Sequence, residues 1–184
     1  DEGHHLFDAA DSAFSAELTG AEMAELRRWL LGAEGGRSRA RGLRRRLEEL
    51  IGDKPELHAQ LDAALLAARA LPVPGWPTRL PGGGSARPDE TPNAGEVFLR
   101  AAREQVLART QDARDAGLYD SECDLFPVTE ALPEAAEGLA RAMRRIEEPL
   151  VALRDRLAAR LEDEAEELEV GDRIRIESAC RALE

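Results

Sequence analysis

Residues 133–161 read PEAAEGLARAMRRIEEPLVALRDRLAARL and carry the strongest secondary-structure signal in the chain. Their large apolar residues recur every three or four positions, which places them on one stripe of an α-helix and predicts the seam of a helix bundle. The stripe consists of Leu139, Met143, Ile146, Leu150, Leu153, Leu157 and Leu161. Pro149 lies inside this run and lacks a backbone donor, so we expect a kink or a break near Glu147 or Glu148.

Shorter segments with the same periodicity lie on both sides of this one. Thr19 and Glu22 form a capping box that opens one helix, and Asn93 and Glu96 give a second capping signal. Asp53 is expected to cap a further helix with Pro55 in its first turn. The predicted helices cover 4–18, 19–31, 38–51, 53–71, 93–116, a run from 133 that Leu168 extends, and a piece after Gly171. The sequence therefore predicts an all-α antiparallel bundle of about six to eight helices.

A long loop is predicted over residues 72–95. Six of the chain's ten prolines lie there, together with Gly82, Gly83 and Gly84, and neither a helix nor a strand is compatible with that composition. Trp76 is expected to pin the start of this loop against the bundle. Residues 118–132 form a second irregular segment, and the whole of 6–184 is interpreted as one helical domain.

The overall charge limits the classes of partner. The 184 residues include 37 acidic and 25 basic side chains, which gives a formal net charge of −12, and only 4% are aromatic. Few aromatics argue against a β-sandwich or barrel, and the negative charge excludes a protein that coats nucleic acid over its whole surface. The acidic block at 162–169 is interpreted as a solvated face of the long helix.

Residues 37–46 contain six positive charges and no acid, and they are the candidate nucleic-acid site. The six residues are Arg37, Arg39, Arg41, Arg44, Arg45 and Arg46. On a helix that starts at Ser38, positions 37, 41, 44 and 45 would share one broad face. Such a stripe could follow the phosphates of single-stranded DNA, or it could be a solvated face paired with nearby glutamates. No aromatic residue is interleaved with the run, so base stacking is not predicted.

The two cysteines indicate a compartment. Cys123 and Cys180 lie far apart without a CxxC partner, and we interpret them as reduced, half-buried thiols of a cytoplasmic protein. No apolar run reaches the roughly 18 residues that a membrane span needs, so no membrane partner is expected.

The first residues carry the one recognisable motif. Asp1-Glu2-Gly3-His4 resembles the Walker B motif of DEAH-type superfamily-two helicases, in which the third residue is usually Ala. Residues 5–15, HLFDAADSAFS, are similar to the segment that follows this box in the XPD/DinG branch. In that branch a helical insertion, the Arch domain, separates the box from the next motor motif. The chain starts with Asp and stops inside a helical pattern, so we expect a fragment of a longer protein.

The resemblance implies that residues 1–5 are a Walker B remnant and that 6–184 are the Arch-like domain of a bacterial DinG/XPD-type ATP-dependent DNA helicase. Its partners would be single-stranded DNA and the parent's own motor domains. Asp1 would hold Mg²⁺ through water, Glu2 would be the general base toward the water that attacks ATP, and His4 would couple the nucleotide site to the second motor domain.

The nucleotide site would be incomplete in this chain alone. It contains no G-x-x-x-x-G-K, so we expect ATP and Mg²⁺ to be used only by the full-length protein. In the family the cysteines of the iron–sulfur cluster precede the DEAH box, so whether the parent carries a cluster stays open.

Two other interpretations of the first residues stay open. They could be a frayed acidic start of a stand-alone helical protein-interaction module without nucleotide chemistry. They could also belong to a metal cluster of Asp1, Glu2, His4, His5 and Asp8, although a terminus is a poor platform for ligands. The reading frame of the parent gene distinguishes these interpretations, because a helicase requires G-x-x-x-x-G-K upstream and a second motor domain downstream.

Overall fold

The computed structural model describes residues 17–34, 41–80, 92–109 and 123–184, and the predicted helix at 4–18 lies almost entirely outside these ranges. Within them the chain forms six α-helices and no strand, which confirms the all-α bundle. The helices are α2 (Gly20–Leu31), α3 (Leu43–Ile51), α4 (Pro55–Ala67), α5 (Ala94–Arg109), α6 (Ala131–Asp163) and α7 (Val170–Ala182), with 3-10 turns η1 (Ala68–Ala70) and η2 (Trp76–Arg79).

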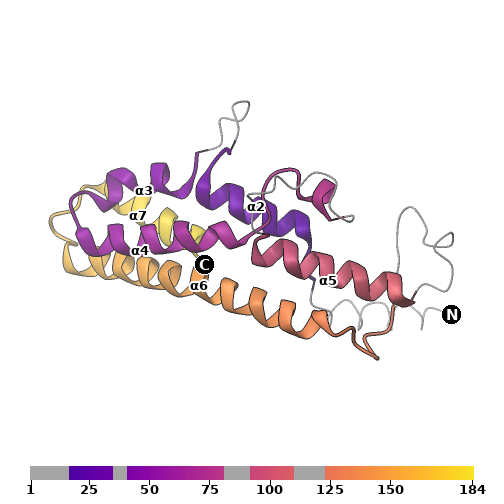
Figure 1. The fold of residues 1–184 in the computed structure, drawn as a ribbon. Helices are drawn as coiled ribbons and strands as arrows, with labels where there is room; N and C mark the ends of the chain where they lie inside the picture. Colours follow the sequence, from indigo (N-terminus) through magenta and orange to yellow (C-terminus); the bar gives the residue numbers. More distant parts are fainter. Residues whose placement is uncertain (1–16, 35–40, 81–91, 110–122) are drawn as a thin grey trace, which may run out of the picture.

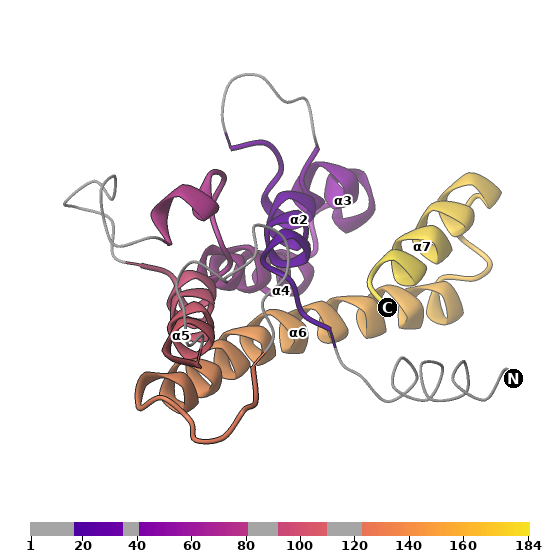
Figure 2. The same ribbon diagram turned by 90° about the vertical axis from the view of Figure 1, so that its right-hand side faces the viewer.

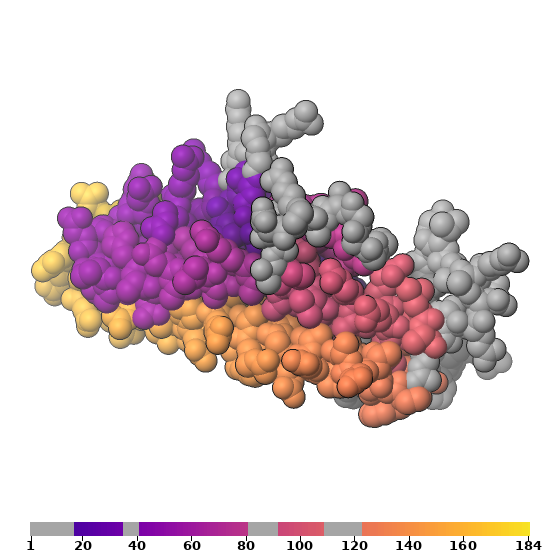
Figure 3. Space-filling model, viewed as in Figure 1, coloured from indigo at the N-terminus to yellow at the C-terminus, as the bar shows by residue number. Residues whose placement is uncertain are grey.

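Helix α6 is the spine of the molecule. Its 33 residues span about 50 Å at 1.5 Å per residue. Helix α5 packs antiparallel along its first part, α4 along its later part, and α7 folds back along its end (Figure 1). The space-filling view shows the elongated molecule that results, with α6 along one edge and α4 and α5 covering it (Figure 3). The seam predicted from residues 133–161 therefore organises the bundle.

Helix α6 continues through Pro149, so of the two predicted outcomes, a kink or a break, the break does not occur. Pro149 is buried on the side of α6 that meets α4. Packing along this contact keeps the helix intact although the proline cannot donate to the preceding turn.

The core forms where the α6 stripe meets the other helices. Leu139, Ile146, Leu153 and Leu157 are buried, and Met143, Leu150 and Leu161 pack around them with partial exposure. The buried partners include Met23 and Leu30 of α2, Leu43, Leu47 and Ile51 of α3, Leu57 and Leu61 of α4, and Ile176 of α7. Each such side chain contributes about 1.5–3 kcal/mol by leaving water, which makes this cluster the main source of stability.

Two predicted helix starts agree with the structure. Thr19 Oγ1 accepts a hydrogen bond from the Glu22 backbone N–H at 3.0 Å, and the Glu22 carboxylate accepts from the Thr19 N–H at 2.8 Å. These bonds, the backbone one first, lower the pKa of Glu22. Asn93 Oδ1 accepts from the Glu96 N–H at 2.9 Å and caps α5. The predicted caps at positions 19 and 93 are confirmed.

Two other starts differ from the prediction. Helix α3 begins at Leu43 after an extended Gly42, so the helix expected from Ser38 is wrong and Arg41 precedes the first turn. Helix α4 has Lys54 rather than Asp53 at its N-cap, although Pro55 does occupy the first turn. In both cases the apolar periodicity is correct and only the boundary differs, since a boundary depends on where the chain must turn.

Gly42 is required by a close approach of backbones. A Cβ at this position would lie 2.6 Å from the carbonyl carbon of Leu31, the last residue of α2, while its φ of −69° suits any residue. The end of α2 and the start of α3 therefore touch, and Arg41 is placed next to the last turn of α2.

The start of the predicted loop at 72–95 is more ordered than its composition indicates. Residues 76–79 form η2, and Trp76 packs on Gly20, where an added Cβ would meet the ring at 2.5 Å. Arg79 donates to the buried carboxylate of Glu96 at 2.7 Å, and that carboxylate also accepts from the Val73 N–H at 3.1 Å. The expected pinning by Trp76 is confirmed, the expected absence of helix at 76–79 is wrong, and Gly82–Gly84 lie outside the described residues.

The acidic block at 162–169 is not one face of the long helix. Helix α6 ends at Asp163, and Glu164 accepts hydrogen bonds from Lys54 and from Arg160, the latter at 2.6 Å. These bonds, with Lys54 as the larger cause, lower the pKa of Glu164. Gly171 lies inside the first turn of α7 instead of separating it from what precedes. Lys54 of the α3–α4 turn and Arg160 of α6 therefore both bind Glu164, where the chain leaves α6.

Candidate nucleic-acid interface

A groove of about 570 Å³ lies between α3 and α7 and is lined by four arginines and one glutamate. These charged residues are Arg41, Arg45, Arg46, Arg175 and Glu49. Helices α3 and α7 are in contact at the end of the bundle away from α5 (Figure 1), and in Figure 2 α7 lies on the opposite side of the view from α5. In a chain with a net charge of −12 this groove is a local reversal of sign.

The amphipathic pattern of α3 turns its arginines toward the groove. Leu43, Leu47 and Leu50 are buried against the bundle, which leaves positions 44–46 on the outer face. Arg45 and Arg46 line the groove, whereas Arg44 forms an ion pair with Asp62 of α4 outside it.

The predicted stripe of arginines is therefore divided. Arg41 belongs to the groove but precedes the helix, and Arg44 does not belong to the groove, so the shared helical face of positions 37, 41, 44 and 45 is wrong. Arg37 and Arg39 lie outside the described residues. Four of the six predicted residues can be placed, and three of these line one groove.

Trp29 is a groove residue that the sequence interpretation missed. It comes from the last turn of α2, and the Arg46 guanidinium lies over its ring at 5.6 Å from the centroid. Arg46 Nε also donates to the Arg41 carbonyl at 3.1 Å. The tryptophan precedes the arginine run by eight residues, so the pattern of residues 37–46 does not contain it. The contact of Gly42 with Leu31 brings the two together.

The arginines of the groove are not equally available. Arg175 is bonded to Glu49 at 3.1 Å and lies 3.8 Å from Asp172, although these exposed pairs hold little energy. Arg41 and Arg45 are exposed, and neither makes an ion pair with any residue of the described part of the chain. Arg41 and Arg45 are thus available to a ligand, Arg46 lies over the aromatic ring, and the charge of Arg175 is partly neutralised.

A buried arginine supports the helix that carries Trp29. Arg27 is 6% exposed, binds the Glu34 carboxylate through two bonds of 2.6 and 2.7 Å, and donates to the carbonyls of Arg69 and Leu71. Its position between Met23 and Leu30 on the apolar stripe of α2 is the sequence signal that could have revealed it.

The residues of the DEAH-like motif cannot be placed. Asp1, Glu2 and His4 lie outside the described residues, as do His5 and Asp8. Among the residues that are described, no group of three or more His, Cys, Asp or Glu side chains could hold a metal ion. In the same ranges no helix combines the length and the apolar character needed to cross a membrane.

The two cysteines are both free and half-buried, as predicted. Burial raises the pKa of the Cys180 thiol, whose Sγ lies 3.8 Å from the Arg154 carbonyl. A raised pKa keeps a thiol protonated and poorly reactive.

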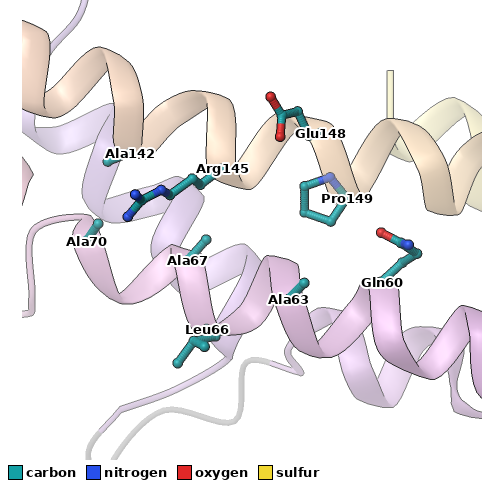
Figure 4. Close-up of a pocket in the computed structure, with 9 residues that line it drawn as sticks. All are labelled: Gln60, Ala63, Leu66, Ala67, Ala70, Ala142, Arg145, Glu148 and Pro149. Atoms are coloured by element: carbon teal, nitrogen blue, oxygen red, sulfur yellow. The ribbon is translucent and has the colours of Figure 1, made fainter.

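A second groove, of about 600 Å³, lies between α4 and α6. Figure 4 shows Ala63 and Ala67 of α4 facing Ala142 and Pro149 of α6, with the Arg145 side chain extending along the gap. Leu66 at its border is 67% exposed. Because its lining is largely apolar, this groove suits an apolar segment better than a phosphate chain.

Comparison of the chain with protein-family models, with curated proteins and with solved structures finds no match in any of the three.

Proposed function

We propose that this chain is the helical insertion domain of a DinG/XPD-type ATP-dependent DNA helicase and that the α3/α7 groove guides single-stranded DNA beside the motor. The observation that carries the proposal is the cluster of four groove arginines against one glutamate on an otherwise acidic chain. The DEAH-like start, Asp1-Glu2-Gly3-His4, supplies the helicase context. ATP and Mg²⁺ would be used by the full-length, cytoplasmic protein.

The charge distribution supports contact with one strand along one edge. Arginine pairs well with phosphate oxygens, and each phosphate neutralised releases counterions. The acidic remainder of the surface repels DNA, so binding is confined to the groove and is weak. A guiding element of a motor benefits from weak contact, because the strand must slide past it.

The salt dependence of binding tests this assignment. With Arg41, Arg45 and Arg46 on phosphates and the charge of Arg175 offset by the neighbouring Glu49, the slope of log K against log salt for a single strand is about −2, at about 0.7 per contact. Affinity for a labelled oligothymidylate then falls by about 20-fold between 50 and 200 mM salt. Fluorescence anisotropy of this chain with the oligonucleotide measures both quantities.

Two neighbouring substitutions on α3 form a matched pair for this assay. Arg45→Gln removes a groove cation and should reduce the slope by about 0.7. Arg44→Gln removes the same charge from outside the groove and should leave the slope unchanged. Equal effects of the two substitutions, or no binding by the unmodified chain at 50 mM salt, would refute the groove as the interface.

The helicase context has its own test in the full-length protein. Arg41→Glu with Arg45→Glu should reduce the stimulation of ATP hydrolysis by single strands, while hydrolysis without DNA stays unchanged. A parent reading frame without G-x-x-x-x-G-K upstream of Asp1 would contradict the helicase assignment and leave the DNA-binding groove to be judged by the anisotropy assay.

A second candidate function is a stand-alone helical protein-interaction module. The apolar α4/α6 groove, with Leu66 exposed at its border, is the observation that favours it. In that case Ala67→Glu, which places a charge in this groove, should abolish partner binding, while Arg45→Gln should not affect it.

A further inference from the structure

The α3/α7 groove combines cations with an aromatic ring, and this combination separates two kinds of ligand. Phosphate contacts alone are made by any charged polymer, whereas an aromatic platform is useful only to a ligand with a flat, unpaired ring. Trp29 lines the same groove as Arg41, Arg45 and Arg46. Within a few side chains the groove therefore offers both parts of a single-strand binding site.

We propose that Trp29 is a stacking platform for one unpaired base and that Arg46 covers this ring until a strand enters the groove. This inference rests on the proposed function and deepens it, because it names unpaired bases, and not phosphates alone, as what the groove recognises.

The position of Arg46 is what a displaceable cover requires. Its guanidinium lies 5.6 Å from the ring centroid, and its Nε donates a hydrogen bond of 3.1 Å to the Arg41 carbonyl. The side chain is exposed and makes no ion pair within the described residues, so no buried partner retains it. Its release from the ring leaves a cation beside the groove, where it can bind the phosphate of the stacked base.

The binding energies favour replacement of Arg46 by a base on the Trp29 ring. A cation over an exposed aromatic ring changes an equilibrium by about two- to fivefold, whereas stacking of a base on an aromatic side chain changes it by about five- to 150-fold. An abasic phosphate chain offers no ring in return, and its phosphates contact Arg46 while this side chain stays over Trp29. Base-dependent affinity is therefore the property that distinguishes this proposal from a purely electrostatic groove.

The core of the bundle and the contacts of Arg27 support the Trp29 ring. Trp29 lies in the last turn of α2, is half-buried against the core cluster, and belongs to the helix that Arg27 ties to Arg69 and Leu71. A ring held at its edge by the core keeps its orientation, which reduces the entropy lost when a base stacks on it.

The experiment compares two labelled 15-mers of equal charge, oligothymidylate and an abasic chain of the same length, by anisotropy at 50 mM salt. The unmodified chain should bind oligothymidylate at least about fivefold more tightly than the abasic chain. Trp29→Leu should remove this preference without changing abasic binding, and Trp29→Phe should keep part of it. Circular dichroism verifies that both variants are folded.

Arg46 provides a readout that a structural role of Trp29 would not affect. Arg46→Gln should weaken binding of both 15-mers but raise the ratio of their affinities, because the ring is then uncovered. Equal affinities of the unmodified chain for the two oligomers, with Arg45→Gln weakening both, would overturn the stacking proposal and leave the electrostatic groove intact. If the unmodified chain binds neither oligomer, the stacking proposal and the electrostatic groove are both refuted.

Discussion

Replacement of Arg27 by methionine tests the buried support of α2. Arg27→Met keeps a long unbranched side chain but removes all four hydrogen bonds that the guanidinium makes. The carbonyls of Arg69 and Leu71 lose donors, and the Glu34 carboxylate loses a bidentate partner. The free-energy cost of each lost bond depends on how far water can reach the group that is left without its partner.

The magnitude can be worked out bond by bond. The buried Leu71 carbonyl costs about 1–2 kcal/mol when it loses its donor, and the part-buried Arg69 carbonyl costs about 1 kcal/mol. Glu34 has a side chain that is 36% exposed, so water replaces part of the lost pairing and its share is about 1 kcal/mol. Arg27→Met should therefore lower the free energy of unfolding by about 3–4 kcal/mol, which corresponds to about 10 °C in Tm for a chain of this length.

Urea denaturation followed by circular dichroism measures this difference, and the next residue supplies the control. Arg28 has a side chain that is 60% exposed, and among the described residues it pairs only with Glu25 one turn away, so Arg28→Met should change the stability by less than about 0.5 kcal/mol. A loss below about 1 kcal/mol for Arg27→Met would refute the argument that the Arg69 and Leu71 carbonyls depend on this side chain. If Arg27→Met does not fold, Arg27→Lys should show a smaller loss with the same sign.

The remaining predictions concern the loop anchor and the α2–α3 contact. The pKa of Glu96 is lowered because the hydrogen bonds from Arg79 and the Val73 N–H outweigh burial, which by itself is the largest single effect and raises it. Because this pKa is lower in the folded state, ionised Glu96 stabilises the fold above about pH 4.3, and this contribution is lost as the pH falls through the pKa of the folded state. Glu96→Gln should therefore lower the free energy of unfolding by about 2–4 kcal/mol at pH 7 and by progressively less below about pH 4, as measured by urea titrations. Gly42→Ala should destabilise by about 2 kcal/mol or more in the same assay, whereas Gly171→Ala, with open space around its Cβ, should be neutral or slightly stabilising.

The local features of the structure, namely the helices and their caps, were predictable from the sequence. The stripe from Leu139 to Leu161, the cap at Thr19 and the cap at Asn93 are encoded within a few successive residues, because helical periodicity and capping join residues three or four apart. The boundaries at Leu43 and Lys54 were missed by one to five residues, since propensity alone does not locate the turn between two packed helices.

The candidate site was only partly predictable. The sequence indicated a basic site at residues 37–46, but which arginines share a groove depends on how α3 lies between α4 and α7. Arg44 turns to Asp62 of α4, whereas Arg45, one residue further, turns to the groove with α7. A difference of one residue is about 100° around a helix, so the neighbouring helices decide the role of each arginine.

By itself, then, the sequence determined that the chain is helical, where most helices lie and which segment concentrates positive charge. Only the tertiary structure placed Trp29 under Arg46, Arg27 on the carbonyls of a distant turn, and Glu96 beside Arg79. The physical reason is the range of the interactions. Periodicity and capping act over one helical turn, whereas these contacts join residues of different elements and exist only after the apolar stripes have packed and the backbones have approached as closely as Gly42 permits.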